Sequence, residues 1–358
     1  MVPSMSPPKP NLPELSESSP ETRAPSRKEQ LMHALQEVQG MQLAFIGLHN
    51  GLVQALAGGG MEEPAALARK TNTDKGYVLR WCEAAYAFGL LEEEGGAFML
   101  SDEGRAYLPD QPGTLMPLAV HSLLGGHMTL RAAELTRTGE RPGEVVLGEQ
   151  AAILPWFGPM LAANFGPLFE QHILPGVPVF EQADRKGGLA VDLGCGNGWY
   201  LRKLAQRMPG LRGLGIDGIG ENIRQAEKLA QEEKLDHRLT FQEGDIYTFS
   251  LPEPADLIAM NRALHHVWDD KERVFKILAD HLKPGGAAVI WEPNWPVELA
   301  ALRQPGKRGM AVQNLAEHIQ GNHFLQPDEI CQQMEKAGLK AHVFLFMNGN
   351  EQVVVGRK

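Results

Sequence analysis

A glycine-rich loop is the part of this sequence whose residue types and spacing point most directly to chemistry. Asp192, Gly194, Gly196 and Gly198 occupy alternate positions between an apolar run and a segment with helical periodicity. Glycine at every second position lets the backbone bend sharply and approach a ligand where a Cβ atom would clash. The loop holds no basic residue to meet a phosphate, and its spacing differs from the G-x-G-x-x-G of dinucleotide-binding loops. It therefore indicates a site for a nucleoside without phosphate.

Acidic and polar residues end the apolar runs that follow, at distances that suit the same ligand. Asp217 comes nineteen residues after Gly198, and a carboxylate at the carboxyl end of a parallel strand can accept both hydroxyl groups of a ribose. Asp245 and Ile246 end the third run, from which a side chain or a backbone amide can reach an adenine ring, and Asn261 ends the fourth. Each position alone is a weak signal, but the ordered set is specific.

Two adjacent histidines, His265 and His266, follow Asn261 in the segment 264–270. A histidine has an ordinary pKa of about 6.5 and can remove a proton from an unionised hydroxyl or a weakly acidic carbon. A histidine pair at a strand–helix junction can equally cap or pack locally, and the residues alone leave both roles open. Because His, Asp and Glu do not recur at metal-ligand spacing, a reaction without a metal is expected.

The ordered motifs resemble those of the class I S-adenosylmethionine-dependent methyltransferases over residues 187–358. Besides the glycine loop and Asp217, the matching features are a Gly-Asp pair at 244–245 and a Lys-Pro-Gly-Gly turn at 283–286. The resemblance implies that S-adenosyl-L-methionine is the cofactor, and that its methionine part, ribose and adenine are held by one set of residues. These are Asp192, Gly194, Gly196, Asp217, Ile219, Asp245, Ile246 and Asn261.

The order of domains also resembles small-molecule methyltransferases that begin with a winged-helix dimerisation domain, including plant-type and bacterial O-methyltransferases of secondary metabolism. These enzymes often carry a catalytic histidine in an L-H-x-W-x-D segment. With Trp268 and Asp270 set in register, His266 takes the catalytic place and His265 replaces the leucine. The resemblance thus implies His266 as the base, ahead of His265, and a homodimer that pairs through the N-terminal domain.

The elements that must position these residues are visible in the alternation of apolar runs and amphipathic helical segments from Gly187 onward. A parallel sheet covered on both faces requires this pattern. The last two runs, 341–347 and 352–356, are separated by a turn and predict an antiparallel hairpin. Together with the resemblance, this predicts an α/β domain over residues 181–358, built on a Rossmann-like, doubly wound sheet of seven strands with an antiparallel last hairpin.

Three segments precede this domain. Residues 1–27 predict a disordered tail, because seven of the 25 prolines fall in the first 25 positions. Residues 28–112 follow the order helix, turn, helix, hairpin, which predicts a winged-helix-like dimerisation domain. Residues 113–180 predict a helical connector that roofs the substrate pocket. The expected substrate-binding residues come from this connector and from the sheet domain: Trp156, Met160, Arg262, Glu292 and Trp295.

Charge and composition exclude several classes of partner. The chain has a net charge of −10, and residues 29–110 hold five basic residues against twelve acidic ones, which opposes a nucleic-acid phosphate backbone. No apolar run is long enough to span a bilayer, and the three cysteines form no C-x-x-C pair. We therefore expect a cytoplasmic protein without a nucleic-acid or membrane partner.

The expected function is methyl transfer from S-adenosylmethionine to a small molecule, at a hydroxyl of an aromatic or secondary metabolite, by in-line displacement with a histidine base. Transfer to nitrogen or carbon without a histidine base is an alternative, because the sulfonium leaving group is already activated. A winged-helix regulator that senses a metabolite with its α/β domain is a second alternative. The identity of the acceptor does not follow from the residues.

Overall fold

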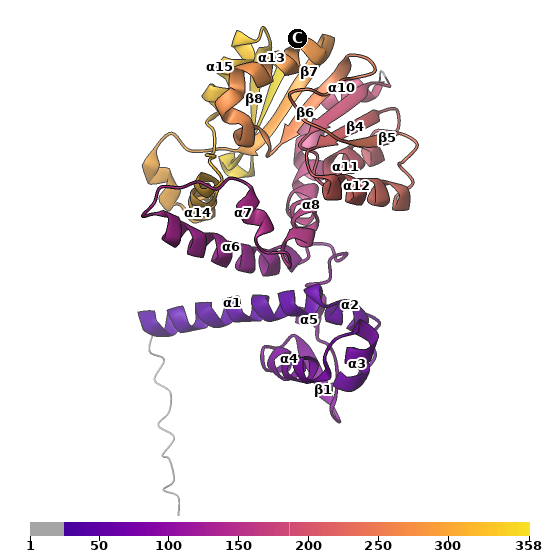
Figure 1. Ribbon diagram of the computed structural model, residues 1–358, viewed down its shortest axis with the longest axis vertical. Coiled ribbons are helices and arrows are strands. Elements are labelled where there is room, and N and C mark those ends of the chain that lie inside the picture. The colour runs from indigo at the N-terminus through magenta and orange to yellow at the C-terminus, as the bar shows by residue number, and fades with distance from the viewer. Residues whose placement is uncertain (1–24, 186) are drawn as a thin grey trace, which may run out of the picture. The chain divides into compact units, whose positions relative to one another are not determined.

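The computed structural model describes residues 25–185 and 187–358 (Figure 1). Two compact units divide the chain between Gln39 and Gly40. This boundary falls inside helix α1 (Arg27–His49). Positions 1–24 of the expected disordered tail, residues 1–27, lie outside the described residues. Helix α1 begins at Arg27, the last residue of that tail.

The elements after α1 are a short helix, then the order helix, helix, hairpin that the sequence predicts, and then another short helix. They are α2 (Leu52–Leu56), α3 (Pro64–Thr71), α4 (Lys75–Ala87), β1 (Leu91–Glu94), β2 (Ala97–Leu100) and α5 (Asp102–Arg105). The carboxylate of Asp74 caps α4 by accepting hydrogen bonds from the amides of Gly76 and Tyr77. β1 and β2 pair in antiparallel register around a Gly95-Gly96 turn, in which both residues have positive φ.

A helical connector leads from this region to the sheet. It consists of α6 (Met116–Leu135), α7 (Val145–Gly148), the 3₁₀ turn η1 (Leu154–Trp156), α8 (Phe157–Leu168), the π-helical turn η2 (Phe169–Ile173), α9 (Leu174–Gly176) and α10 (Val179–Arg185). Met116, Val120 and Met160 of the connector belong to the same apolar core as Leu48 and Trp81. Phe165, Phe169 and Ile173 of the connector pack in the core of the sheet domain, so the connector contacts both the preceding helices and the sheet domain.

The sheet has seven strands in the order β5-β4-β3-β6-β7-β9-β8. They are β3 (Leu189–Leu193), β4 (Arg212–Asp217), β5 (Leu239–Glu243), β6 (Ala255–Asn261), β7 (Leu282–Pro293), β8 (Lys340–Phe346) and β9 (Glu351–Arg357). The first five strands of the order are parallel, while β9 is antiparallel to both of its neighbours. The predicted doubly wound sheet with an antiparallel last hairpin is confirmed.

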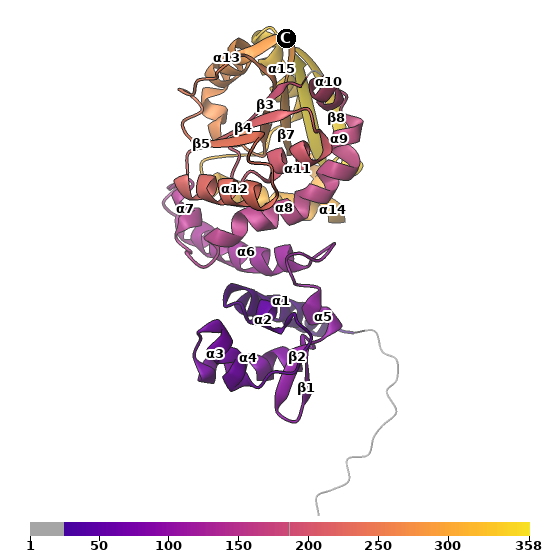
Figure 2. The same cartoon turned by 90° about the vertical axis from the view of Figure 1, so that its right-hand side faces the viewer.

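Helices cover both faces of this sheet (Figure 1 and Figure 2). α11 (Trp199–Arg207), α12 (Gly220–Glu232) and α10 contribute to the core on one face, and α13 (Lys271–His281) and α15 (Pro327–Lys336) to the core on the other. Successive residues of a strand serve opposite faces: Ala190 belongs to the first core, whereas Leu189 and Val191 belong to the second. The remaining elements are the 3₁₀ segments η3 (Leu264–Asp270), η4 (Leu299–Arg303) and η5 (Met347–Gly349) and helix α14 (Pro305–Ile319).

The strand order fixes where a ligand can bind. Chain connections from β3 lead to β4 and β5 on one side, and the later parallel strands β6 and β7 lie on the other. The crevice outside the carboxyl ends of β3 and β6 is therefore a topological switch point, where open α/β sheets bind their ligands. None of the described helices combines the length and the apolar character that crossing a bilayer requires.

Candidate functional site

The glycine loop between β3 and α11 leaves room for a ligand because its residues adopt backbone conformations that favour glycine. Gly196 has a φ of 54°, and a Cβ added there would meet no atom within 4 Å. Gly198 has a φ of 72°, and a Cβ there would lie 2.5 Å from the ring of Phe241. Gly198 is thus required for packing, whereas Gly196 borders open space.

Asp217, at the end of β4, is fixed by three donors. Its Oδ2 accepts a hydrogen bond of 2.8 Å from the amide of Gly196, and its Oδ1 accepts from the amide of Ile219 at 2.9 Å and from Nδ2 of Asn222 at 3.0 Å. These bonds join the glycine loop to the start of α12. The sequence predicted Asp217 and Ile219, but it held no signal for Asn222, which lies within the first turn of α12.

Asp192 and Asn261 meet at the ends of β3 and β6. Asn261 donates from Nδ2 to Oδ1 of Asp192 at 2.8 Å. Burial raises the pKa of Asp192 to about 8, against the opposing effect of the Asn261 hydrogen bond, and the charge of Asp217 adds to the rise. Oδ1 of Asn261 is buried without a hydrogen-bond partner among the described residues. A buried amide oxygen without a partner favours a ligand that brings a hydrogen-bond donor.

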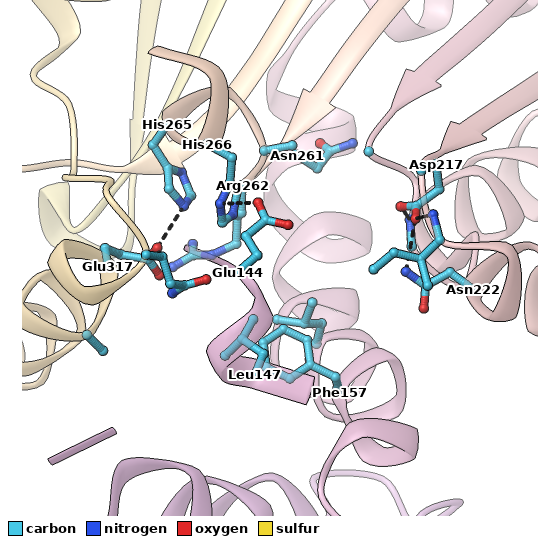
Figure 3. Close-up of a pocket in the computed structure, with 18 of the residues that line it drawn as sticks. Glu144, Leu147, Phe157, Asp217, Asn222, Asn261, Arg262, His265, His266 and Glu317 are labelled. Atoms are coloured by element: carbon cyan, nitrogen blue, oxygen red, sulfur yellow. Dashed lines mark hydrogen bonds and ion pairs between the residues drawn. The ribbon is translucent and has the colours of Figure 1, made fainter. Parts of the chain in front are cut away.

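These residues line one large cavity of about 1240 Å³, together with the connector (Figure 3). Seven of the eight expected cofactor residues border it: Gly194, Gly196, Asp217, Ile219, Asp245, Ile246 and Asn261. Asp192 is not among the described lining residues and lies beneath them, bonded to Asn261. The opposite part of the cavity is walled by apolar residues of α6 and α8, including Leu124, Met128, Phe157 and Leu161.

His265 is buried between two carboxylates that come from different elements. Its Nδ1 lies 2.6 Å from Glu292 at the end of β7, and its Nε2 lies 3.6 Å from Glu317 on α14. The other oxygen of Glu292 accepts hydrogen bonds from the amides of Leu264 and His265. Burial by itself would lower the pKa of His265, but the attraction of Glu292 and the hydrogen bonds to Glu292 and Glu317 outweigh it and raise the pKa to about 10.

His266 borders the same cavity. The centroids of the His265 and His266 rings are 4.2 Å apart. Its Nδ1 lies 2.8 Å from Oε1 of Glu144, a connector residue just before α7, and 2.8 Å from Nδ2 of Asn322 after α14. Figure 3 shows His265 and His266 directed toward Glu317 and Glu144 at one end of the cavity, with Asp217 and Asn222 at the other. The hydrogen bond with His266 lowers the pKa of Glu144, so that this carboxylate stays ionised.

Sequence reasoning did not identify Glu144, Glu317 or Asn322. Glu144 lies in a polar interruption of the connector, and the other two residues lie beyond β7, so no local pattern relates them to the histidines. Donor atoms of His265, His266 and Glu317 lie within 4.8 Å of one another, a group that could hold a metal ion. The spacing along the chain did not reveal this group, and a reaction without a metal stays a prediction.

The expected substrate-binding residues divide into two sets. Met160 and Arg262 line the cavity, whereas Trp156, Glu292 and Trp295 are not among the described residues that do. Glu292 is fully buried beneath His265, so it acts on that histidine and not on a ligand. Trp156 packs edge-on against Phe45, and Trp295 packs against Phe324.

Arg262 is already paired within the protein. Its guanidinium donates to Glu351 at 2.6 Å and stacks 4.1 Å above the centre of the Phe165 ring. The backbone of Arg262 has a φ of 54°, and its amide donates to the carbonyl of Trp291 at 2.7 Å. Arg262 therefore presents a neutralised, stacked side chain to the cavity rather than a free cation.

Part of this chain is similar in sequence to methyltransferases. Residues 190–286 match the family described as a methyltransferase domain. An uncharacterized methyltransferase of Geobacillus kaustophilus is 29% identical over 163 residues, which cover 44% of this chain and 72% of the relative. The O-methyltransferase SfmM3 of Streptomyces lavendulae is 28% identical over 244 residues, which cover 64% of this chain and 68% of the relative.

Solved structures share the fold over nearly the whole chain. An O-methyltransferase family protein from Burkholderia thailandensis has a TM-score of 0.68 at 19% identity and covers 94% of this chain and 99% of its own. Human N-acetylserotonin methyltransferase, solved in complex with S-adenosylmethionine, has a TM-score of 0.65 at 20% identity and covers 94% and 99%. At these identities the likeness establishes the fold.

Proposed function

We propose that this chain, whose residues 190–286 match a methyltransferase domain, transfers the methyl group of S-adenosylmethionine to a hydroxyl of a small, largely apolar acceptor. The observation that carries this proposal is a single cavity, bordered at one end by the glycine loop and Asp217 and at the other by His266. The cofactor and the acceptor can thus occupy one cavity, as direct methyl transfer requires.

The residues of the cofactor end fit this cofactor. The unsatisfied Oδ1 of Asn261 suits a hydrogen-bond donor such as the amino group of the methionine part, and the fixed carboxylate of Asp217 suits a ribose. The open space beside Gly196 would receive the ligand where a Cβ atom would intrude. When bound, S-adenosylmethionine supplies a methyl group on an already activated sulfonium, so the protein mainly positions the acceptor and excludes water.

We assign the base to His266 ahead of His265. Both ring nitrogens of His265 face carboxylates and its pKa is about 10, so it keeps its proton at neutral pH. His266 borders the cavity, with its Nδ1 side held by Glu144 and Asn322. Its Nε2 can accept the proton that the acceptor hydroxyl loses as the new O–CH₃ bond forms.

The walls of the acceptor end support an uncharged acceptor. Apolar residues of α6 and α8 supply most of this surface, and Arg262 is neutralised by Glu351. Glu144 and Glu317 would repel an acceptor carboxylate. A cyclic or aromatic hydroxyl compound fits these properties best.

Mass spectrometry of products tests the proposal. The purified protein is incubated with methyl-labelled S-adenosylmethionine and a panel of phenols, alcohols, amines, indoles and carboxylates. A gain of one labelled methyl group on hydroxyl compounds supports the proposal. Methylation confined to amines or to carbon would support the alternative class, in which replacement of both histidines leaves turnover nearly intact.

A homodimer that forms through the N-terminal region is a further part of this proposal. Leu31, Leu35 and Val38 recur at three- and four-residue steps along α1 and are exposed. Such a stripe suits pairing with a second copy of the helix. Light scattering on the full chain and on the L31E/L35E variant tests it: a dimer that the variant converts to a monomer is expected, whereas a monomeric native chain would refute it.

A further inference from the structure

Nδ1 of His266 has two close neighbours, one of which requires it to donate a hydrogen bond and the other to accept one. Oε1 of Glu144 and Nδ2 of Asn322 each lie 2.8 Å from this nitrogen. A carboxylate oxygen can only accept a hydrogen bond, and an amide NH₂ group can only donate one. One ring nitrogen of a neutral imidazole cannot satisfy both, because it either carries a proton or does not. The two neighbours therefore favour opposite tautomers of His266.

The orientation of the Asn322 amide is set by a third residue. Asn322 is buried, and its side chain also hydrogen-bonds to Glu317, which can only accept. The NH₂ group therefore faces the histidines, and Asn322 acts as a donor toward Nδ1. If Asn322 alone set the tautomer, the proton of neutral His266 would lie on Nε2, and this nitrogen could not serve as a base.

Glu144 reaches His266 from outside the cofactor domain, on a segment with its own anchoring. This segment, residues 143–149, is held by a hydrogen bond from the Gly143 amide to the carbonyl of Ile319 and by a small apolar core in which Val146 is fully buried. The carbonyl of Val146 lies 3.0 Å from Nε2 of His127, and Glu149 pairs with Arg131 of α6 at 3.1 Å. The position of Glu144 therefore depends on packing between α6, α7 and α14.

We propose that Glu144 is a positioning residue that selects the tautomer of His266 able to take the proton of the acceptor. This inference rests on the proposed function. With Nδ1–H donated to Glu144, Nε2 is the unprotonated nitrogen. As the O–CH₃ bond forms and the S–CH₃ bond breaks, with its electron pair kept by sulfur, the hydroxyl proton moves to Nε2. The resulting imidazolium keeps Nδ1–H against the Glu144 carboxylate, which balances its charge, and later releases the acceptor's proton to water.

The charged groups around His266 come from two other elements and from its own element, η3. They are Glu144 from the segment 143–149, Glu317 from α14 and His265 from η3. Glu317 and His265 face each other, so Glu144 is the carboxylate in direct contact with His266. When Glu144 is removed, Asn322 becomes the remaining neighbour of Nδ1.

The test replaces Glu144 and, as a control, a carboxylate outside this contact. The variants are E144A, E144Q and the control E140Q, which alters an exposed carboxylate before the segment 143–149. We expect E144A to lower kcat about 10- to 100-fold with little change in KM, as is usual when a partner that orients a histidine is lost. E144Q keeps a side-chain oxygen that can accept Nδ1–H but not the charge, so it should lose less than E144A, and E140Q should match the native enzyme.

A spectroscopic readout needs no acceptor. Nitrogen NMR of the full chain with ¹⁵N-labelled histidine, with the signal of His266 assigned through H266N, reports which ring nitrogen carries the proton. Native protein should show the proton on Nδ1, and E144A should show it on Nε2. Equal tautomers in native protein and E144A, or an E144A variant that keeps the native kcat, would overturn the inference. Because the NMR measurement does not depend on methyl transfer, it separates failure of this inference from failure of the proposed function.

Discussion

The side-chain amide of Asn261 donates a hydrogen bond of 2.8 Å to the carboxylate of Asp192, across two neighbouring parallel strands and 69 positions of sequence. This contact joins the ends of β3 and β6 at the switch point of the sheet. It also leaves the Asn261 oxygen unsatisfied among the described residues. The cofactor end of the cavity is therefore prepared for a ligand that brings a hydrogen-bond donor.

Loss of this contact should weaken cofactor binding. The N261A variant removes both the donor that orients Asp192 and the free amide oxygen, so we expect the Kd for S-adenosylmethionine to rise about 10-fold, the value of one buried hydrogen bond. Calorimetry measures this, with N50A as the control because Asn50 is exposed and lies before α2. An unchanged Kd in N261A would show that the contact has no part in binding.

The D217N variant should affect the same affinity more strongly. The native carboxylate accepts from Gly196, Ile219 and Asn222, and an amide would place an NH₂ group against at least one of these donors. We expect the Kd to rise by about 100-fold, since a ribose acceptor and the shape of the loop are lost together. The N222A variant, which removes one of the three donors, should cause a smaller rise. Equal affinities in D217N and the native protein would contradict the assignment of the ribose site.

The type of sheet and the residues at strand ends could be predicted because both depend on local patterns. Apolar runs between amphipathic segments require a covered parallel sheet, and Asp217 and Asn261 reach the crevice because strand ends of one direction share an edge. Glu144, Glu317 and Asn322 could not be predicted in the same way. They reach the histidines through the packing of α6, α7 and α14, and this packing produces no periodic pattern in the sequence.

Glu292 shows the limit of predicting a role from position. Its place at the end of β7 correctly indicates the edge of the site, and this suggested a contact with the substrate. The side chain is instead covered completely by η3, whose first two amides and His265 ring use both of its oxygens. Whether a carboxylate at a strand end faces the ligand or supports a neighbour depends on the segment that covers it.

Stability without ligand should depend on pH through Asp192. Burial, together with the nearby charge of Asp217, raises the pKa of Asp192 from 3.8 to about 8, so the unfolded chain loses this proton at lower pH than the folded protein does. Its contribution to stability is fully present below about pH 4 and is lost as pH rises through 8, at about 1.4 kcal/mol per pH unit. Denaturant unfolding of native protein and D192N tests this. The native protein should lose stability relative to the variant as pH rises from about 4 to 8, and parallel curves would contradict the assignment.

Chelation of metal ions should leave methyl transfer unchanged. The leaving group is activated as a sulfonium, and the proposed proton acceptor is His266, so methyl transfer by this route needs no Lewis acid. Turnover is measured before and after dialysis against EDTA, and again after addition of zinc, manganese or magnesium. A loss on dialysis that one of these ions restores would instead assign the group of His265, His266 and Glu317 to a metal.

His265 should remain protonated well above neutral pH. Burial opposes the charge, but Glu292 and Glu317 hold the pKa of the ring at about 10. Nitrogen NMR of the labelled histidines about two pH units below this value should show one imidazolium that disappears in H265N. If the ring is neutral at this pH, His265 becomes a candidate for the base and the preference for His266 fails.

The initial rate of labelled methyl transfer to a hydroxyl acceptor, compared between native protein and H266N at saturating S-adenosylmethionine, tests the central claim most directly. H323N is the matched control, because His323 is exposed and is not among the described residues that line the cavity. We predict that H266N slows transfer about 10²- to 10⁴-fold, the usual contribution of a general base, while cofactor affinity and the rate of H323N stay at native values. Transfer by H266N at the native rate would contradict the assignment of His266 as the base.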